Sequence, residues 1–172
     1  MTITATEQRV AAPAHWSVDP DESFVEFAVK TFWGAATVHG RFDRFDGSYD
    51  VGPDETTIEL TIYADSLDTG NDTRDKHLRS TDFFHITEHP QVHFTSTRVH
   101  NVNGETIHVV GRLEATGNVA QLEFPATVRR VGDKLEIEAT TTVDQSQLGM
   151  SSGKLGMIRR PATLHVKAQL TR

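Results

Sequence analysis

The sequence predicts an all-β fold of about eight antiparallel strands, and three observations carry this prediction. Apolar and polar residues alternate with period two in segment after segment, as in strands with one buried face. Turn signals such as Asn103-Gly104 and Gly132-Asp133 separate these segments. No long segment has the 3.6-residue apolar period of a helix. The strands therefore form either two packed sheets or a closed barrel.

The alternation marks the strands in order along the chain. In the first strand Val25, Phe27 and Val29 form the apolar face. In the long second run, from Val38 to Tyr49, the alternation slips by one residue after Phe42, which predicts a β-bulge or a bend. The later strands present these apolar faces: Ile58, Leu60 and Ile62; Val92 and Phe94; Ile107, Val109, Gly111 and Leu113; Leu122, Phe124, Ala126 and Val128; Leu135, Ile137, Ala139 and Val143; Leu164, Val166, Ala168 and Leu170.

The residues of the inner faces favour a barrel with a hollow interior. Two glycines, Gly40 and Gly111, share these faces with large phenylalanine rings, which would leave gaps beside the rings. A barrel of about eight strands is just wide enough to be filled by side chains or to hold one slender ligand. A sandwich core would also tolerate this composition, so the two architectures stay open on periodicity alone.

The segment from Ser66 to Phe84 predicts a short helix between strands. Asn71 or Thr73 can cap its start, and Asp75 precedes Arg79 by four residues, the favourable order for a helical ion pair. Phe83 and Phe84 follow directly, so the helix brings two aromatic rings close to the point where the sheet resumes.

Arg74 and His77 on this helix could hold a polar head group at a cavity mouth, because arginine donates readily to phosphate or carbonyl oxygens. A network of salt bridges between helix and loop explains the same residues equally well. Leu78 lies one turn from Arg74 on the same helix face.

Length and composition exclude several classes of protein. A chain of 172 residues without cysteine predicts one domain without disulfides or thiolate metal sites, here residues 15–172 after a flexible tail of residues 1–14. The net charge of −7 disfavours nucleic acid as a partner. No apolar run is long enough for a transmembrane segment, and the first residues do not resemble a secretory signal, so we expect a cytoplasmic protein.

The sequence predicts no catalytic residues, no metal site and no resident cofactor. Gly149 to Gly153 spells G-x-S-x-G, but no acidic residue follows it, so a hydrolase triad cannot be completed in the required order. His85, His89 and His93 are spaced by four residues, yet Pro90 would interrupt a helix that aligned them. We therefore interpret these histidines as surface residues.

Several motifs carry a resemblance to a known family. Their order and spacing are specific together, although each alone is weak, and they are Trp16-Ser17-Val18-Asp19-Pro20, Val25-x-Phe27-x-Val29, Val38-x-Gly40-x-Phe42-x-x-Phe45-x-Gly47, Ser66-Leu67-Asp68-Thr69-Gly70, Arg74-Asp75-x-His77-Leu78-Arg79-Ser80-x-Asp82-Phe83-Phe84, Pro90-x-Val92-x-Phe94-x-Ser96 and Gly111-x-Leu113. From about Trp16 to Leu170 the chain resembles the YceI-like family, also called polyisoprenoid-binding or lipid-binding YceI-like domains.

This resemblance implies a lipocalin-like, extended antiparallel eight-stranded β-barrel with a short helix near its mouth. It also implies a homodimer, and a tunnel that holds a long apolar ligand such as a polyisoprenoid, an isoprenoid quinone or another lipid.

The leading hypothesis is therefore a non-catalytic lipid carrier. The predicted ligand-binding residues are Phe27, Val29, Val38, Phe42, Phe45, Leu60, Ile62, Arg74, His77, Leu78, Phe83, Phe84, Phe94, Val109, Leu113 and Phe124. Two alternatives remain: an enzyme that uses His77 or Asp75 as acid or base on a lipid-like substrate, and a structural, dimerising barrel with a filled interior.

Overall fold

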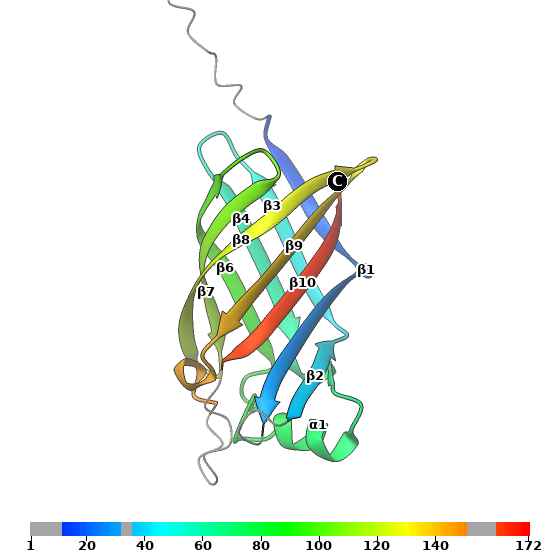
Figure 1. Cartoon of the computed structure of the whole chain (residues 1–172), viewed down its shortest axis with the longest axis vertical. Helices are drawn as coiled ribbons and strands as arrows, with labels where there is room; N and C mark the ends of the chain where they lie inside the picture. Colours follow the sequence, from blue (N-terminus) through cyan, green and yellow to red (C-terminus); the bar gives the residue numbers. More distant parts are fainter. Residues whose placement is uncertain (1–11, 32–35, 151–160) are drawn as a thin grey trace, which may run out of the picture.

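The computed structural model describes residues 12–31, 36–150 and 161–172 (Figure 1). Residues 1–11 of the predicted tail lie outside this part, and the first strand begins at Ala14. The strands are β1 (Ala14–Thr31), β2 (Ala36–Phe42), β3 (Phe45–Val51), β4 (Thr56–Tyr63), β5 (Leu67–Asp68), β6 (Gln91–Asn101), β7 (Thr106–Ala115), β8 (Asn118–Val131), β9 (Lys134–Val143) and β10 (Ala162–Thr171). The helices are α1 (Asp72–Leu78) and the short 3-10 helices η2 (Ala64–Ser66) and η3 (Gln145–Leu148).

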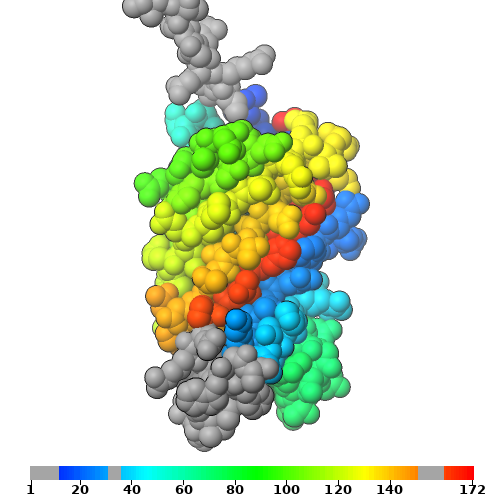
Figure 2. All heavy atoms as spheres, viewed as in Figure 1, coloured from blue at the N-terminus to red at the C-terminus, as the bar shows by residue number. Residues whose placement is uncertain are grey.

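Eight of these strands form a closed antiparallel barrel, which decides between the two architectures that periodicity left open. Each strand pairs with its neighbour in the order β3-β4-β6-β7-β8-β9-β10-β1, and β1 closes the ring by pairing with β3. Strands β1, β10, β9 and β8 lie side by side and tilted across one face (Figure 2). Closure leaves these strands without an exposed edge.

The first strand is long enough to join the barrel to an extension at one end. The second half of β1 pairs with β2 from Val25 to Thr31, and β2 in turn pairs with the two-residue β5. Helix α1 follows β5 and lies at this end of the molecule (Figure 1). We call this end the α1 end of the barrel. The opposite end carries the turns that join β3 to β4 and β8 to β9.

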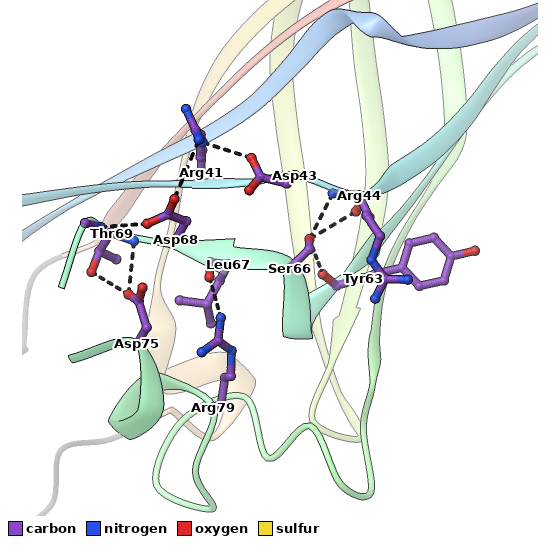
Figure 3. Close-up of polar contacts among 11 residues, drawn as sticks. Arg41, Asp43, Arg44, Tyr63, Ser66, Leu67, Asp68, Thr69, Asp75 and Arg79 are labelled. Atoms are coloured by element: carbon purple, nitrogen blue, oxygen red, sulfur yellow. Dashed lines mark hydrogen bonds and ion pairs between the residues drawn. The ribbon is translucent and has the colours of Figure 1, made fainter. Parts of the chain in front are cut away.

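The predicted bend after Phe42 is confirmed. Strand β2 ends at Phe42 and β3 begins at Phe45, and both rings are buried. The backbone between them bonds to the neighbouring segment, with the Asp43 amide on the Ser66 carbonyl at 3.2 Å and the Tyr63 amide on the Arg44 carbonyl at 3.1 Å. The Arg44 amide also donates to the Ser66 hydroxyl at 3.0 Å (Figure 3). The two-residue break allows both phenylalanines to face inward.

The two inner-face glycines do not leave gaps, which corrects the reason given for a hollow interior. A Cβ added to Gly40 would lie 2.3 Å from Cζ of Phe27, and one added to Gly111 would lie 2.4 Å from Cζ of Phe94. Each ring therefore lies directly on its glycine and takes up the vacant space. Any free volume must come from elsewhere in the barrel.

Helix α1 begins where the sequence predicts. The Asn71 side chain accepts a hydrogen bond from the Arg74 amide at 2.9 Å, which caps the helix. The buried Asp75 carboxylate accepts from the Thr69 amide at 3.0 Å and from its hydroxyl, and so ties α1 to the residue that follows β5. The Arg79 side chain donates instead to the Asp65 carbonyl at 3.1 Å and to the Leu67 carbonyl at 2.7 Å, and Figure 3 shows the second of these bonds. The side chains of Asp75 and Arg79 thus bond to the segment from Asp65 to Thr69, while the Arg79 amide donates to the Asp75 carbonyl at the end of the helix.

Within the described residues, no helix has the length and apolar character needed to cross a membrane.

Candidate functional site

Within the part of the chain that the structure describes, two apolar cavities lie inside the barrel. The first, of about 110 Å³, lies in the half of the barrel away from α1, and we call it the distal cavity. Its walls come from most of the barrel strands, and its lining includes Val18, Val25, Ile58, Leu60, Phe94, Leu122, Phe124, Ala126, Ile137, Ala139, Val166, Ala168 and Leu170. Inward-facing residues of strands produce this lining, because successive side chains alternate between the two faces.

The second cavity, of about 90 Å³, lies at the α1 end, and we call it the proximal cavity. Aromatic and aliphatic side chains surround it, including Phe27, Val29, Phe42, Leu78, Phe83, Phe84, Val92, Ala115, Val143, Leu148, Met150 and Ala162. The Phe84 ring packs edge-on against Phe42 with centroids 5.7 Å apart. Helix α1 and the turn after it therefore form part of the cavity wall.

Three side chains line both cavities: Ile62, Leu113 and Leu164. They come from β4, β7 and β10, and we call them the collar. The two cavities are thus adjacent compartments of one interior. A chain longer than one compartment would have to pass the collar.

Trp16 packs at the end of the barrel beyond the distal cavity. It is buried against Ala168 and Leu170, and the guanidinium groups of Arg130 and Arg172 lie 5.6 and 4.9 Å from its ring centroid. Such cation–π contacts stabilise a ring with its other face in the core. In the same cluster, burial raises the pKa of the Tyr49 hydroxyl, so this group stays neutral at ordinary pH.

Eleven of the sixteen predicted ligand-binding residues line a cavity. Leu60, Phe94 and Phe124 line the distal cavity; Phe27, Val29, Phe42, Leu78, Phe83 and Phe84 line the proximal cavity; Ile62 and Leu113 belong to the collar. The structure therefore brings residues from β1, β2, β4, β6, β7, β8, α1 and the following turn around one interior.

Three predicted apolar residues lie outside both cavity linings. Phe45 and Val109 are fully buried parts of the hydrophobic core, whereas Val38 is half-buried on β2, opposite Val29. Close packing rather than free volume surrounds Phe45 and Val109. Alternation cannot distinguish these two situations, because both place the side chain on the inner face.

The two polar residues proposed to hold a head group also lie outside the cavity linings. The Arg74 guanidinium donates to the hydroxyl and carbonyl oxygens of Thr69, both at 2.8 Å. The His77 side chain is 61% exposed, with Nε2 3.5 Å from a carboxylate oxygen of Asp82. These contacts favour the alternative in which both residues belong to a polar network that holds α1.

The enzyme alternative named His77 or Asp75 as acid or base, and neither lines a cavity. The Asp75 carboxylate already accepts hydrogen bonds from the amide and the hydroxyl of Thr69. Of the G-x-S-x-G motif, Gly149 ends η3 and Met150 lines the proximal cavity, while residues 151–153 lie outside the described part of the chain.

The prediction missed one whole wall of the interior. Strands β9 and β10 contribute to the distal cavity through Ile137, Ala139, Val166, Ala168 and Leu170, and Leu164 completes the collar. Period-two alternation identifies these residues as well, since they share the inward face of β9 and β10. The predicted set is rich in aromatic residues, whereas the walls from β9 and β10 are aliphatic or small.

Sequence comparison relates the chain to a described family. The YceI-like domain matches residues 16–170. A UPF0312 protein of Pectobacterium carotovorum subsp. carotovorum is 34% identical over 134 residues, which cover 76% of this chain and 69% of the relative. A UPF0312 protein of Pseudomonas aeruginosa is 34% identical over 128 residues, covering 72% of this chain and 66% of the relative.

Solved structures share the fold at low sequence identity. BcnA of Burkholderia cenocepacia superposes with a TM-score of 0.79 at 18% identity, covering 88% of this chain and 98% of that protein. A polyisoprenoid binding domain from Saccharophagus degradans superposes with a TM-score of 0.75 at 16% identity, covering 91% and 97%. At such identities the similarity concerns the fold alone.

Proposed function

Because the chain belongs to the YceI-like domain family, we propose that its barrel binds a slender apolar molecule of the polyisoprenoid or lipid class in the distal and proximal cavities. The observation that carries the proposal is the pair of adjacent, apolar compartments inside one closed barrel. The description of the Saccharophagus degradans neighbour as a polyisoprenoid binding domain agrees with it. Binding, rather than catalysis, is the proposed activity.

The shape of the interior selects for a thin chain. An apolar cavity of roughly 150 Å³ can hold one benzene molecule, so each compartment, at about 110 and 90 Å³, has room for about one five-carbon unit. The collar of Ile62, Leu113 and Leu164 lies where the two compartments meet. A chain that occupies both must displace these side chains, which rotate more easily than the strands move.

Burial of the ligand supplies the binding free energy. Each buried methylene contributes about 0.8 kcal/mol, so a five-carbon isoprene unit contributes about 4 kcal/mol. Two such units give about 8 kcal/mol against an association cost of roughly 4–15 kcal/mol. Short polyprenols should therefore bind weakly, and affinity should rise with each unit that finds room past the collar.

The filled-barrel alternative has a specific observation in its favour. Each compartment is smaller than the roughly 300–1,000 Å³ of ordinary small-molecule pockets. Without displacement of the collar, the interior is close to packed.

Organic extraction of the purified native protein followed by mass spectrometry tests the proposal. We expect a stoichiometric isoprenoid or other long apolar molecule, or uptake of a polyprenol or quinone after incubation. An empty extract together with no uptake would contradict the proposal and favour the filled barrel. A substrate-dependent reaction that is lost in His77→Ala would favour the enzyme alternative.

The homodimer and the cytoplasmic location remain further parts of the proposal. Sedimentation of the purified chain measures the first, and fractionation of the producing cells measures the second.

A further inference from the structure

The turn that follows α1 brings three potential metal ligands together. Among the described residues, His85, Glu88 and His89 form a group whose ligand atoms all lie within 4.8 Å of one another. Both histidines are half-buried and the glutamate is exposed. The group lies outside both cavity linings and is separate from the proposed lipid site.

A single hydrogen-bonded turn of the backbone builds this group. The amides of Glu88 and His89 both donate to the His85 carbonyl, at 3.1 and 2.8 Å. This turn brings the chain from residue 85 back to residue 89, so the two imidazoles lie close together. The rings lie edge to face with centroids 5.7 Å apart, and Nδ1 of His85 is 3.9 Å from Oε2 of Glu88.

Neighbouring segments hold the turn in place. The His85 amide donates to the Ser80 carbonyl at 2.9 Å and the Ile86 amide to the Arg79 carbonyl at 3.2 Å, which fastens the turn to the end of α1. His85 has φ 48°, in the left-handed region that histidine and asparagine enter more readily than most residues. On the other side, a Cβ at Gly117 would lie 3.4 Å from Cε1 of His89, so the β7–β8 turn packs against this ring.

His93, the third histidine in the series spaced by four residues, lies apart from His85 and His89. His93 lies on β6, and its Nδ1 is 3.1 Å from the Thr61 hydroxyl of β4. The interruption expected at Pro90 therefore separates His93 from the other two, while the five residues before Pro90 still complete a turn. The structure substitutes Glu88 for His93 as the third member, which the sequence-based prediction of no metal site did not consider.

We propose that His85, Glu88 and His89 bind a divalent transition-metal ion of the zinc class. Two imidazoles and one carboxylate are a donor set that zinc uses, and three protein ligands leave a fourth tetrahedral position for water or an oxygen of a bound molecule. Ligand atoms in such a site lie roughly 3.3 Å apart, as follows from metal–ligand distances of about 2.0–2.2 Å. The present separations all lie within 4.8 Å, and rotation of the exposed Glu88 side chain and small ring movements can bring the ligand atoms to metal-binding distance.

Titration of the full-length, metal-stripped protein with Zn²⁺ by calorimetry tests this site. We expect one Zn²⁺ per chain, with binding lost in His85→Asn and His89→Gln and weakened about tenfold or more in Glu88→Gln. His85→Asn is chosen because asparagine tolerates the positive φ, and Glu88→Gln because the exposed side chain can be changed without disturbing the fold. His93→Gln is the matched control, a histidine four residues further on that should leave binding unchanged.

Cobalt substitution provides a second measurement. Co²⁺ bound to the wild-type chain should give the intense visible absorption of tetrahedral coordination, and the same spectrum should appear in His93→Gln but not in His89→Gln. The proposal would be overturned if the wild type bound no zinc, or if the His85 and His89 variants bound zinc as tightly as the wild type. Loss of binding in His93→Gln would also overturn it.

Discussion

Filling the distal cavity from its own wall provides a direct test of the binding hypothesis. Ala139 lies on the inner face of β9 and lines this cavity, so Ala139→Phe directs a ring into the space. The next residue, Thr140, is exposed on the outer face of the same strand, so Thr140→Phe adds the same ring outside the barrel as a matched control. Comparison of the two variants separates the effect of filling the distal cavity from the effect of placing a phenylalanine on β9.

The magnitude of the effect follows from the cavity size. A benzene-sized ring needs a cavity of roughly 150 Å³, so the new side chain takes up essentially all of the available 110 Å³. The ligand then loses burial of about one five-carbon unit, which is about 4 kcal/mol at ~0.8 kcal/mol per carbon. Since each 1.4 kcal/mol changes affinity about tenfold, binding should weaken about a thousandfold. Overpacking should cost the fold only about 1–3 kcal/mol.

Binding of a long-chain polyprenol, which should bind more tightly than a short one, measures the effect when it is followed by calorimetry or by displacement of a fluorescent probe. Thermal unfolding of both variants shows that the barrel remains folded. If Ala139→Phe and Thr140→Phe bind the polyprenol equally well, the ligand does not occupy the distal cavity and the argument from the cavities fails.

Three further predictions concern the fold. Asp75→Asn should lower the free energy of unfolding in urea by about 1.5–3 kcal/mol, because the neutral amide replaces a buried, charged acceptor of two hydrogen bonds. Gly111→Ala should destabilise the barrel, because its Cβ would lie 2.4 Å from the Phe94 ring, and Phe94→Leu in the same chain should recover part of the loss. A hydrogen bond from His165 lowers the pKa of Glu138 below 4.5, so the free energy of unfolding should fall as pH drops below that value, and less steeply in Glu138→Gln.

The sign of the pH effect follows from the lowered pKa. Well above the ordinary glutamate pKa of 4.5, the Glu138 carboxylate is charged in both the folded and the unfolded chain, and its full stabilisation is present. As pH falls, the unfolded chain takes up the proton first, so the stabilisation is lost as pH passes through the folded-state pKa. Equal acid sensitivity of wild type and Glu138→Gln, measured by urea unfolding at several pH values, would contradict this assignment.

Asp75→Asn and Gly111→Ala each have a control variant. Asp82→Asn changes an exposed carboxylate of the same segment and should leave the stability nearly unchanged, whereas Asp75→Asn should not. A double variant of Gly111 and Phe94 that is no more stable than Gly111→Ala alone would show that the ring is not the obstacle.

Local patterns predicted much of the fold correctly. The inner face of nearly every strand, the bend after Phe42 and the Asn71 cap of α1 follow from residues that are close in sequence. Period-two alternation reports which face of a strand is buried, and capping depends on one side chain and the amides of the next turn. These features therefore need no knowledge of the partner strands.

The candidate site was predicted less completely, because free volume depends on residues that are distant in sequence. Eleven predicted residues line the cavities, but Phe45 and Val109 are close-packed although they follow the same alternation. The rings of Phe27 and Phe94 cover glycines that were expected to leave space. Whether an inward side chain meets a partner or a void is decided by register and by the size of the residue across the barrel.

The sequence by itself determined that the chain makes amphipathic strands with a short capped helix, because those properties arise within a few consecutive residues. Only the tertiary structure decided that β1 pairs with both β10 and β3, that Ile62, Leu113 and Leu164 divide the interior, and that Glu88 rather than His93 joins His85 and His89. Each of these outcomes depends on which distant segments pair and in which register, and that choice minimises the free energy of the whole chain rather than of any one segment.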